Sequence, residues 1–241
     1  MKCIILAAGY ATRLYPLTLH QPKPLLPVAG KAILDWLVDD LDPLTDEFIV
    51  VSNHKFAAQF RAWAAGKTQM ITVLDDGTES NETRLGAVRD IQLAARDITG
   101  DCLVMAGDNV LDFSLRHFVR FAREKGTSCV MCHEENRLEA LQKTAVITMN
   151  ENHLITSYEE KPKEPKGNHA VPPFYFYRAA DICRIQEALD AGCGYDAPGS
   201  FAAWLSGKVS MHAYVMPGKR FDIGDMKSYE TVQAVYKGIT Q

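Results

Sequence analysis

The sequence predicts an α/β protein with a mostly parallel sheet, helices on both faces and a smaller mixed-sheet lobe. Three observations support this prediction. In the first half, short apolar runs alternate with longer amphipathic stretches. In the second half, strand-like runs follow one another with short connections. No linker divides the 241 residues, so we expect one domain, 1–241, with lobes 1–110 and 111–241.

The first lobe is expected to alternate strands and helices. Buried strands are predicted by the apolar runs at residues 3–8, 48–52, 70–74 and 102–106. Helices are predicted by apolar residues at helical spacing over residues 31–41, 55–65 and 85–95. This order favours a parallel sheet with right-handed crossovers, which binds ligands beyond the carboxyl ends of its strands. We therefore expect the first loop, the 75–84 turn and Asp108 at one edge.

The second lobe is expected to be built mainly from short strands. Strand-like runs occupy residues 127–132, 144–149, 153–158, 171–177 and 209–215. Helices are expected over residues 179–191 and 226–237. The stretch 159–170 is polar, charged and proline-bearing, so it is expected to be a surface loop.

Composition excludes several classes of protein. Hydrophobic residues make up 47% of the chain, which supports a packed core and argues against disorder. The net charge is −4 with acids and bases mixed, so no nucleic-acid-binding face is indicated. No apolar run reaches the roughly 18–20 residues that span a bilayer, and the start does not resemble a signal peptide. A cytoplasmic location is expected.

The cysteines in apolar strand-like runs, Cys3, Cys102 and Cys129, are expected to be structural. Cys129 and Cys132, next to His133, superficially offer metal-ligand spacing. They lie in a predicted strand, where residues three apart point to opposite faces, so both thiols cannot bind one ion. Reduced thiols inside apolar strands act as small hydrophobic groups.

The loop after the first strand has the composition of a phosphate-binding site. Its small residues Ala7, Ala8 and Gly9 allow backbone N–H groups to approach a polyanion closely. Two isolated cations, Arg13 and Lys23, follow in a proline-punctuated stretch. Neither a Walker loop nor a dinucleotide fingerprint fits, because required glycines are missing. We interpret the stretch as a triphosphate-binding loop.

This loop resembles the signature of a known family. The run Leu-Ala-Ala-Gly-x-x-Thr-Arg-Leu-x-Pro-Leu-Thr begins at Leu6, and Pro-Lys-Pro-Leu-Leu-Pro-Val begins at Pro22. Together they resemble the sugar-1-phosphate nucleotidyltransferases, which include glucose-1-phosphate thymidylyl- and uridylyltransferases. The resemblance implies a Rossmann-like, nucleotide-diphospho-sugar transferase fold. It also implies an enzyme that converts a nucleoside triphosphate and a sugar-1-phosphate into a nucleotide sugar and pyrophosphate.

The resemblance also assigns roles to residues. The catalytic cations would be Arg13, Lys23 and Lys161, the last in a Glu-Lys-Pro motif whose Lys contacts the sugar phosphate. The nucleotide would be bound by Leu6, Ala7, Ala8, Gly9, Thr12 and Gly86.

Two carboxylates are candidate Mg²⁺ ligands. Asp108 follows a predicted buried strand, where a carboxylate can bind Mg²⁺ together with substrate oxygens or can cap a turn. Asp222, in Asp-Ile-Gly, resembles the second metal ligand of the family, and Asp225 is the alternative. Relatives often carry an aromatic residue two positions before this Asp, where the present chain has Arg220.

Three positions are expected to line the sugar pocket. Glu160 precedes Lys161 in the Glu-Lys-Pro motif and would contact the ring. Ala145 stands where relatives commonly have Gly, and Pro173 lies in a Pro-Pro pair that replaces Thr-Gly or Asn-Gly. These departures indicate that the acceptor need not be plain glucose-1-phosphate.

The sequence leaves alternatives open for the substrates and for the class of protein. UTP or dTTP is the favoured nucleotide. A cytidylyltransferase for phosphocholine or a phosphonate shares the N-terminal motif. A non-catalytic regulatory subunit that binds sugar nucleotides is a reading of another class, disfavoured because the charged motif residues are retained. Relatives are commonly oligomers, so a homo-oligomer is a further possibility, with no nucleic-acid or membrane partner.

Overall fold

The computed structural model describes residues 1–240. Contacts divide the chain into two compact units. Unit 1 comprises Met1–Leu85, Ala106–Arg116 and the chain from Pro217 on, and unit 2 comprises Gly86–Met105 and His117–Met216. Each unit is therefore assembled from separated stretches, whereas a single cut at residue 110 would leave both lobes continuous. The description as one domain with those two lobes stays a prediction.

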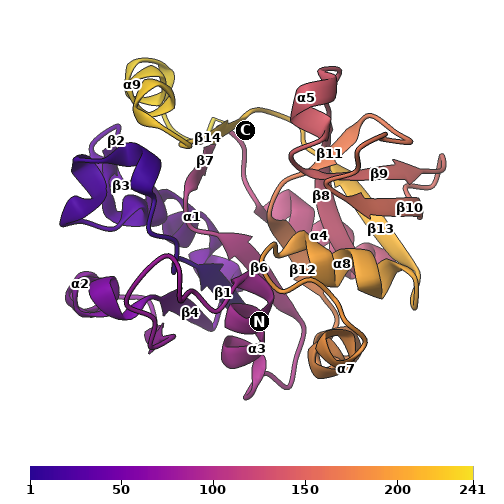
Figure 1. Cartoon of the computed structure of the whole chain (residues 1–241), viewed down its shortest axis with the longest axis horizontal. Helices are drawn as coiled ribbons and strands as arrows, with labels where there is room; N and C mark the ends of the chain where they lie inside the picture. Colours follow the sequence, from indigo (N-terminus) through magenta and orange to yellow (C-terminus); the bar gives the residue numbers. More distant parts are fainter. Residues whose placement is uncertain (241) are drawn as a thin grey trace. The chain divides into compact units, whose positions relative to one another are not determined.

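Unit 1 contains three parallel strands, β1 (Lys2–Leu6) and β4 (Glu47–Ser52), both labelled in Figure 1, and β5 (Ile71–Asp75). Lys2 pairs with Glu47, and Phe48 pairs with Ile71. The connections contain α1 (Ile33–Leu41) and α2 (His54–Ala65), and α2 packs on β4 and β5. Apolar residues that are buried on both faces of β1 and β4 explain why these strands lie inside the unit.

The long first loop of unit 1 is folded into short elements. These are η1 (Thr12–Leu14), η2 (Leu17–Leu19), η3 (Lys23–Leu25), β2 (Pro27–Val28) and β3 (Lys31–Ala32), with η4 (Asp42–Leu44) after α1. Ala11 has a φ of 47° and precedes η1, and its carbonyl accepts a hydrogen bond from Thr18. The Tyr15–Pro16 peptide is cis.

The C-terminal segment completes unit 1. β14 (Arg220–Asp222) pairs antiparallel with β7 (Asn109–Leu111), although the two strands are far apart in the sequence (Figure 1). α9 (Met226–Val235) follows. A core joins this segment to the first loop, and its buried members are Leu14, Leu26, Val28, Ile33, Val110, Ile223, Val232 and Tyr236.

Unit 2 is built around antiparallel pairs. β12 (Phe174–Tyr177) lies between β6 (Cys102–Ala106) and β8 (Ser128–Glu134). β11 (His169–Val171) joins β8 to β9 (Ala145–Met149), and β10 (Ile155–Glu160) pairs with β9. β13 (Met211–Val215) is parallel to β8. The helices are α3 (Ala87–Ala95), α4 (Arg116–Lys125), α5 (Leu138–Leu141), α6 (Ala179–Ile182), α7 (Ile185–Asp190) and α8 (Gly199–Ser206).

The predicted fold class is confirmed, with a parallel first half and a mixed second half. Three expectations about the second half are wrong in detail. The stretch 159–170 is not one loop, because its ends belong to β10 and β11. The run 171–177 is interrupted by Pro172 and Pro173, since proline cannot donate to the strand ladder. The helix expected over 179–191 is two short helices, and α8 was not predicted.

The buried cysteines behave as predicted. Cys129 and Cys132 are completely buried in β8, and burial raises their pKa values to about 11 and about 12. A thiol with such a pKa is almost entirely protonated at neutral pH and is a poor metal ligand. Within residues 1–240, no cluster of three or more His, Cys, Asp or Glu side chains is arranged to hold a metal. In the same range, no helix combines the length and apolarity needed to cross a bilayer.

Candidate functional site

Lys23 and Asp108 meet in unit 1. Lys23 begins η3, and Asp108 lies in the turn between β6 and β7. The Lys23 Nζ atom donates to Asp108 Oδ2 at 2.7 Å. The lysine side chain is only 11% exposed, whereas the aspartate side chain is 36% exposed. A nearly buried ammonium thus faces a carboxylate that remains open to solvent.

The pairing of β7 with β14 brings the second predicted metal ligand to the same place. Asp222 lies opposite Asn109, the residue next to Asp108. Asn109 donates from Nδ2 to Asp108 Oδ1 at 2.7 Å, and its Oδ1 accepts from Arg220 Nη1 at 2.6 Å. The same guanidinium lies 3.5 Å from Asp222 Oδ2. Asn109 and Arg220 therefore link the two carboxylates into one polar cluster.

Asp225, the alternative metal ligand, is engaged elsewhere. Its carboxylate caps α9 by accepting from the Ser228 backbone N–H at 2.8 Å. These hydrogen bonds from Ser228, with a smaller contribution from the nearby charge of Arg13, lower the pKa of the Asp225 carboxyl. Arg13 itself is exposed in η1. The role of Asp225 in capping the helix favours Asp222 as the ligand.

The predicted nucleotide-binding residues of the first loop are only partly open. Leu6 and Ala7 use backbone groups internally: the Leu6 carbonyl accepts from Gly107 and the Ala7 N–H donates to Val51. The Ala8 carbonyl accepts from Asn53 Nδ2 at 2.9 Å. Gly9 is exposed, with open space where a Cβ would stand, and Thr12 is exposed too. Ligand contacts in this loop are therefore expected mainly from Gly9 onward.

The remaining candidates belong to unit 2. Sheet register places Ala145 between Glu160 of β10 and Val171 of β11, and Pro173 follows β11. Burial raises the pKa of the Glu160 carboxyl, while the charge of Lys161 opposes this shift. Lys161 is exposed and has a φ of 48°, and its N–H donates to Thr144. A left-handed lysine is unusual and is found where the surroundings fix the backbone.

The backbone conformation at position 86 explains why this residue is a glycine. It precedes α3 with a φ of 93°, which favours glycine. A Cβ at this position would lie 2.6 Å from the Tyr195 carbonyl oxygen. The first N–H groups of α3 are capped by this same segment, because Ala87 donates to Asp196 and Val88 donates to Tyr195.

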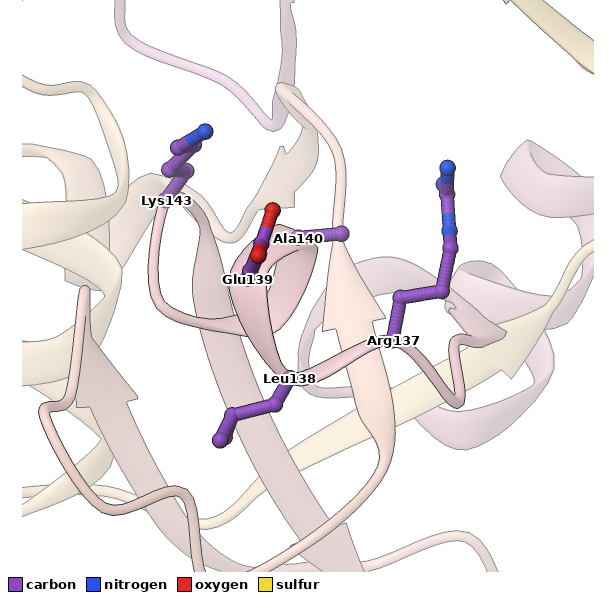
Figure 2. Close-up of a pocket in the computed structure, with 5 residues that line it drawn as sticks. All are labelled: Arg137, Leu138, Glu139, Ala140 and Lys143. Atoms are coloured by element: carbon purple, nitrogen blue, oxygen red, sulfur yellow. The ribbon is translucent and has the colours of Figure 1, made fainter.

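A separate hollow of about 670 Å³ is lined by Arg137, Leu138, Glu139, Ala140 and Lys143. Figure 2 shows Arg137 and Lys143 at the two ends of α5, with Glu139 between them. Arg137 is already held by Glu135 through two hydrogen bonds. None of the sequence-predicted residues lines this hollow.

Sequence reasoning missed Asn53 and Asn109 as polar residues of the site, and it noted Arg220 without giving it a role. Asn53, Asn109 and Arg220 hold Ala8, Asp108 and Asp222 respectively, through the contacts described above. Asn109 could have been proposed from the sequence, because it directly follows Asp108. The contact of Asn53 with Ala8 could not, because it depends on tertiary packing. The structure joins Lys23, Asp108 and Asp222, and places Lys161 and Glu160 in unit 2. Convergence of all these groups on one substrate stays a prediction.

Comparison with known proteins identifies the family. A family model described as nucleotidyl transferase matches residues 2–238. The chain belongs to the nucleotidyl transferase family. This match confirms the family resemblance found in the first loop. It also shows that the similarity to the family covers nearly the whole sequence of this nucleotidyl transferase.

Several curated relatives are sugar-1-phosphate nucleotidyltransferases. The UTP–glucose-1-phosphate uridylyltransferase AglF of Haloferax volcanii is 28% identical over 234 residues, which cover 93% of this chain and 91% of the relative. The mannose-1-phosphate guanylyltransferase catalytic subunit beta of Drosophila pseudoobscura is 28% identical over 242 residues, covering 98% and 62%. Against bifunctional GlmU proteins of Methanococcus vannielii and Methanococcus aeolicus, this chain spans only 36% and 38% of their length.

Solved structures share the fold. A crystal structure of UDP-glucose pyrophosphorylase with UDP-glucose matches 98% of this chain with a TM-score of 0.80 at 20% identity, and 97% of that chain is covered. A Bacillus anthracis structure described as a glucose-1-phosphate thymidylyltransferase, in complex with sucrose, matches with a TM-score of 0.85 at 23% identity. It covers 100% of this chain and 97% of that chain. At these identities the likeness shows that the fold of this nucleotidyl transferase is the same.

Proposed function

We propose that this chain joins a nucleoside triphosphate to a sugar-1-phosphate, giving a nucleotide sugar and pyrophosphate. The observation that carries the proposal is the cluster of Lys23, Asp108 and Asp222 in unit 1, in a chain that matches the family over residues 2–238. The relatives named as a uridylyltransferase and a guanylyltransferase of sugar-1-phosphates support nucleotidyl transfer to a sugar-1-phosphate.

The chemistry requires cations more than a base. An oxygen of the sugar phosphate attacks the α-phosphorus, the new O–P bond forms, and the bond to the β-phosphate oxygen breaks, so pyrophosphate leaves. The attacking phosphate is already largely ionised near pH 7, because its second pKa is about 6. The main obstacle is repulsion between two polyanions with roughly six negative charges. Arg13, Lys23 and Lys161 would compensate part of this charge as it develops at the α-phosphate.

Asp108 and Asp222 suit a Mg²⁺ ion. Mg²⁺ prefers one or two carboxylates together with substrate phosphate oxygens and water. Asp222 pairs with Asn109, the residue next to Asp108, and both carboxylate side chains are accessible, at 36% exposure for Asp108 and 54% for Asp222. When bound, the ion would polarise and orient the phosphates. Lys23 would keep Asp108 in place and Arg220 would do the same for Asp222.

A pyrophosphate-release assay tests the proposal. Purified protein with Mg²⁺ is given UTP, dTTP, CTP and GTP, each with glucose-1-phosphate, other sugar-1-phosphates, phosphocholine and a phosphonate. We expect release with a sugar-1-phosphate and UTP or dTTP, and turnover about 10²-fold lower for Asp108→Ala. Release with phosphocholine or the phosphonate alone would indicate the cytidylyltransferase alternative. No release with any pair, together with tight binding of nucleotide sugar, would indicate a regulatory subunit.

The same protein preparation addresses assembly. Light scattering measures whether it is a homo-oligomer, which the family resemblance favours. A cytoplasmic location belongs to the proposal as well, because nucleoside triphosphates and sugar phosphates would be its substrates.

A further inference from the structure

The end of β10 meets the start of α8 in unit 2. Tyr158 and Glu160 are two residues apart on β10, so their side chains lie on the same face of the strand. α8 packs against β10 and begins at Gly199. The contact between the two elements is therefore made by a tyrosine, a glutamate and a glycine.

Gly199 allows an unusually close approach. A Cβ at this position would overlap Glu160 Oε2 and would lie 3.4 Å from the Tyr158 hydroxyl. Gly199 is buried, so the groups packed around it have little freedom to move away. Its φ is not in the left-handed region, so space rather than backbone conformation explains the glycine.

Two polar atoms at this contact lack partners. Within residues 1–240, Glu160 Oε2 and the Tyr158 hydroxyl are buried and make no hydrogen bond. Burial is the main cause that raises the pKa of the Tyr158 phenol, and the neighbouring Tyr175 adds to it, although the Tyr158 hydroxyl makes no hydrogen bond of normal geometry. An unsatisfied buried polar atom destabilises the folded chain, because it has lost its hydrogen bonds to water without replacement. Two such atoms side by side are expected where a ligand supplies the missing partners.

We propose that the Tyr158 hydroxyl acts with Glu160 to bind a hydroxyl group of the acceptor, and that Gly199 provides the room that the Glu160 carboxylate occupies. The inference rests on the proposed function and deepens it by assigning a second recognition group. One sugar hydroxyl can donate to the carboxylate and accept from the phenol, so a single hydroxyl satisfies both atoms. A quaternary ammonium has neither N–H nor O–H and would leave both unpaired.

Tyr158→Phe tests the recognition role, because it removes only the hydroxyl. We expect the KM for the sugar-1-phosphate to rise about tenfold while the KM for the nucleoside triphosphate stays unchanged. Tyr177→Phe is the matched control: its hydroxyl is also buried without a partner, but its ring packs on Phe201. The control should keep both KM values. Equal effects of the two substitutions, or no effect of Tyr158→Phe, would overturn the proposal.

Gly199→Ala tests the role of space. The added methyl group should displace the Glu160 carboxylate and raise the KM for the acceptor with little change in the KM for the triphosphate. Gly207→Ala, at the other end of α8, adds a methyl at an ordinary 3.4 Å from the Trp204 carbonyl and should be silent. Adding Glu160→Asp to Gly199→Ala shortens the clashing side chain and should restore part of the lost affinity.

The outcomes separate this inference from the proposed function. A wild type that turns over a sugar-1-phosphate, with variants that keep its KM, contradicts the inference alone. A wild type inactive with every sugar-1-phosphate contradicts the proposed function and the inference together. Melting curves of all variants show whether they are folded, and Tyr158→Phe preserves shape if Gly199→Ala does not fold.

Discussion

At the scale of single residues, Lys23 shows how a surface-type side chain becomes part of a site. Lysine is rarely buried unless it is paired. Here Pro22 and Pro24 flank Lys23 in η3, and the ammonium reaches Asp108 across 85 positions of sequence. Desolvation strengthens the attraction between the two charges, and it makes the loss of either partner costly.

Lys23→Met should therefore lower turnover by about 10²-fold, because a cation near the phosphates is lost and Asp108 loses its partner. Initial rates of pyrophosphate release measure the effect. Lys31→Met is the control, since Lys31 pairs with Asp39 at the same distance of 2.7 Å but both side chains are more than 40% exposed. Exposed pairs contribute little, so near-normal turnover is expected. Equal losses in both variants would argue against a site at Lys23.

Glu160 gives a pH-dependent prediction. Burial raises the pKa of its carboxyl above the ordinary value of 4.5, so the ionised form is less stable in the folded chain than in the unfolded chain. The penalty is present above the raised pKa and disappears below pH 4.5, where both states are protonated. Glu160→Gln should raise the melting temperature near pH 7, and the gain should vanish near pH 4.

Melting curves of ligand-free protein between about pH 4 and pH 8 measure this difference. The same substitution should weaken acceptor binding, since function requires the carboxylate. A Glu160→Gln protein that melts below the wild type at pH 7 would show that the carboxylate is stabilising instead.

At the scale of elements, α2 and the first loop are joined by one side chain. Asn53 is fully buried and caps α2 by accepting from the Phe56 N–H at 3.1 Å. Its amide also donates to the Ala8 carbonyl. The helix start therefore fixes the loop in which Gly9 is exposed, and the elements of unit 1 position the proposed nucleotide site.

Asn53→Ala should cost about 2 kcal/mol of unfolding free energy, because it removes a helix cap and leaves the partly buried Ala8 carbonyl unpaired. Asn53→Ser keeps a capping oxygen but is too short to reach Ala8. It should recover part of the stability and still raise the KM for the triphosphate. Urea denaturation and steady-state kinetics measure the two effects. Normal triphosphate KM in both variants would contradict a role for this link.

At the scale of the whole molecule, unit 1 depends on the last part of the chain. Ile223, Val232 and Tyr236 are buried in the core that also contains Leu14 and Val28. The Tyr236 hydroxyl donates to the Leu111 carbonyl at 2.8 Å. The segment after Pro217 thus supplies core residues as well as Asp222.

A chain that ends at Met216 should lose the cooperative folding of unit 1. Burial of three large side chains is worth about 5–9 kcal/mol, which is comparable to the stability of a whole domain. A chain that ends at Gly238 keeps β14, α9 and these residues and serves as the control. Amide hydrogen exchange of β1 and β4 reports folding of unit 1. Full protection of both strands in the shorter chain would contradict this prediction.

The order of strands and helices in unit 1 could be predicted from the sequence because hydrophobic periodicity is a local property. The interruption of a strand by proline and the division of a helix in the second half were harder to predict. Short elements such as β11 and α8 are stabilised more by contacts with neighbouring elements than by the propensity of their own residues. Glu159 and Glu160 illustrate this: their polarity indicates a loop, but pairing with β9 places them in a strand.

The sequence by itself determined the fold class, the family and the candidate residues. The motif of the first loop and the spacing of apolar residues are local properties that can be recognised in short stretches of sequence. Only the tertiary structure decided which polar groups hold those residues. Asn53, Asn109, Arg220 and Gly199 act on partners that strand pairing and packing bring close from distant parts of the chain. Such contacts depend on strand register and close packing, which local sequence patterns do not encode.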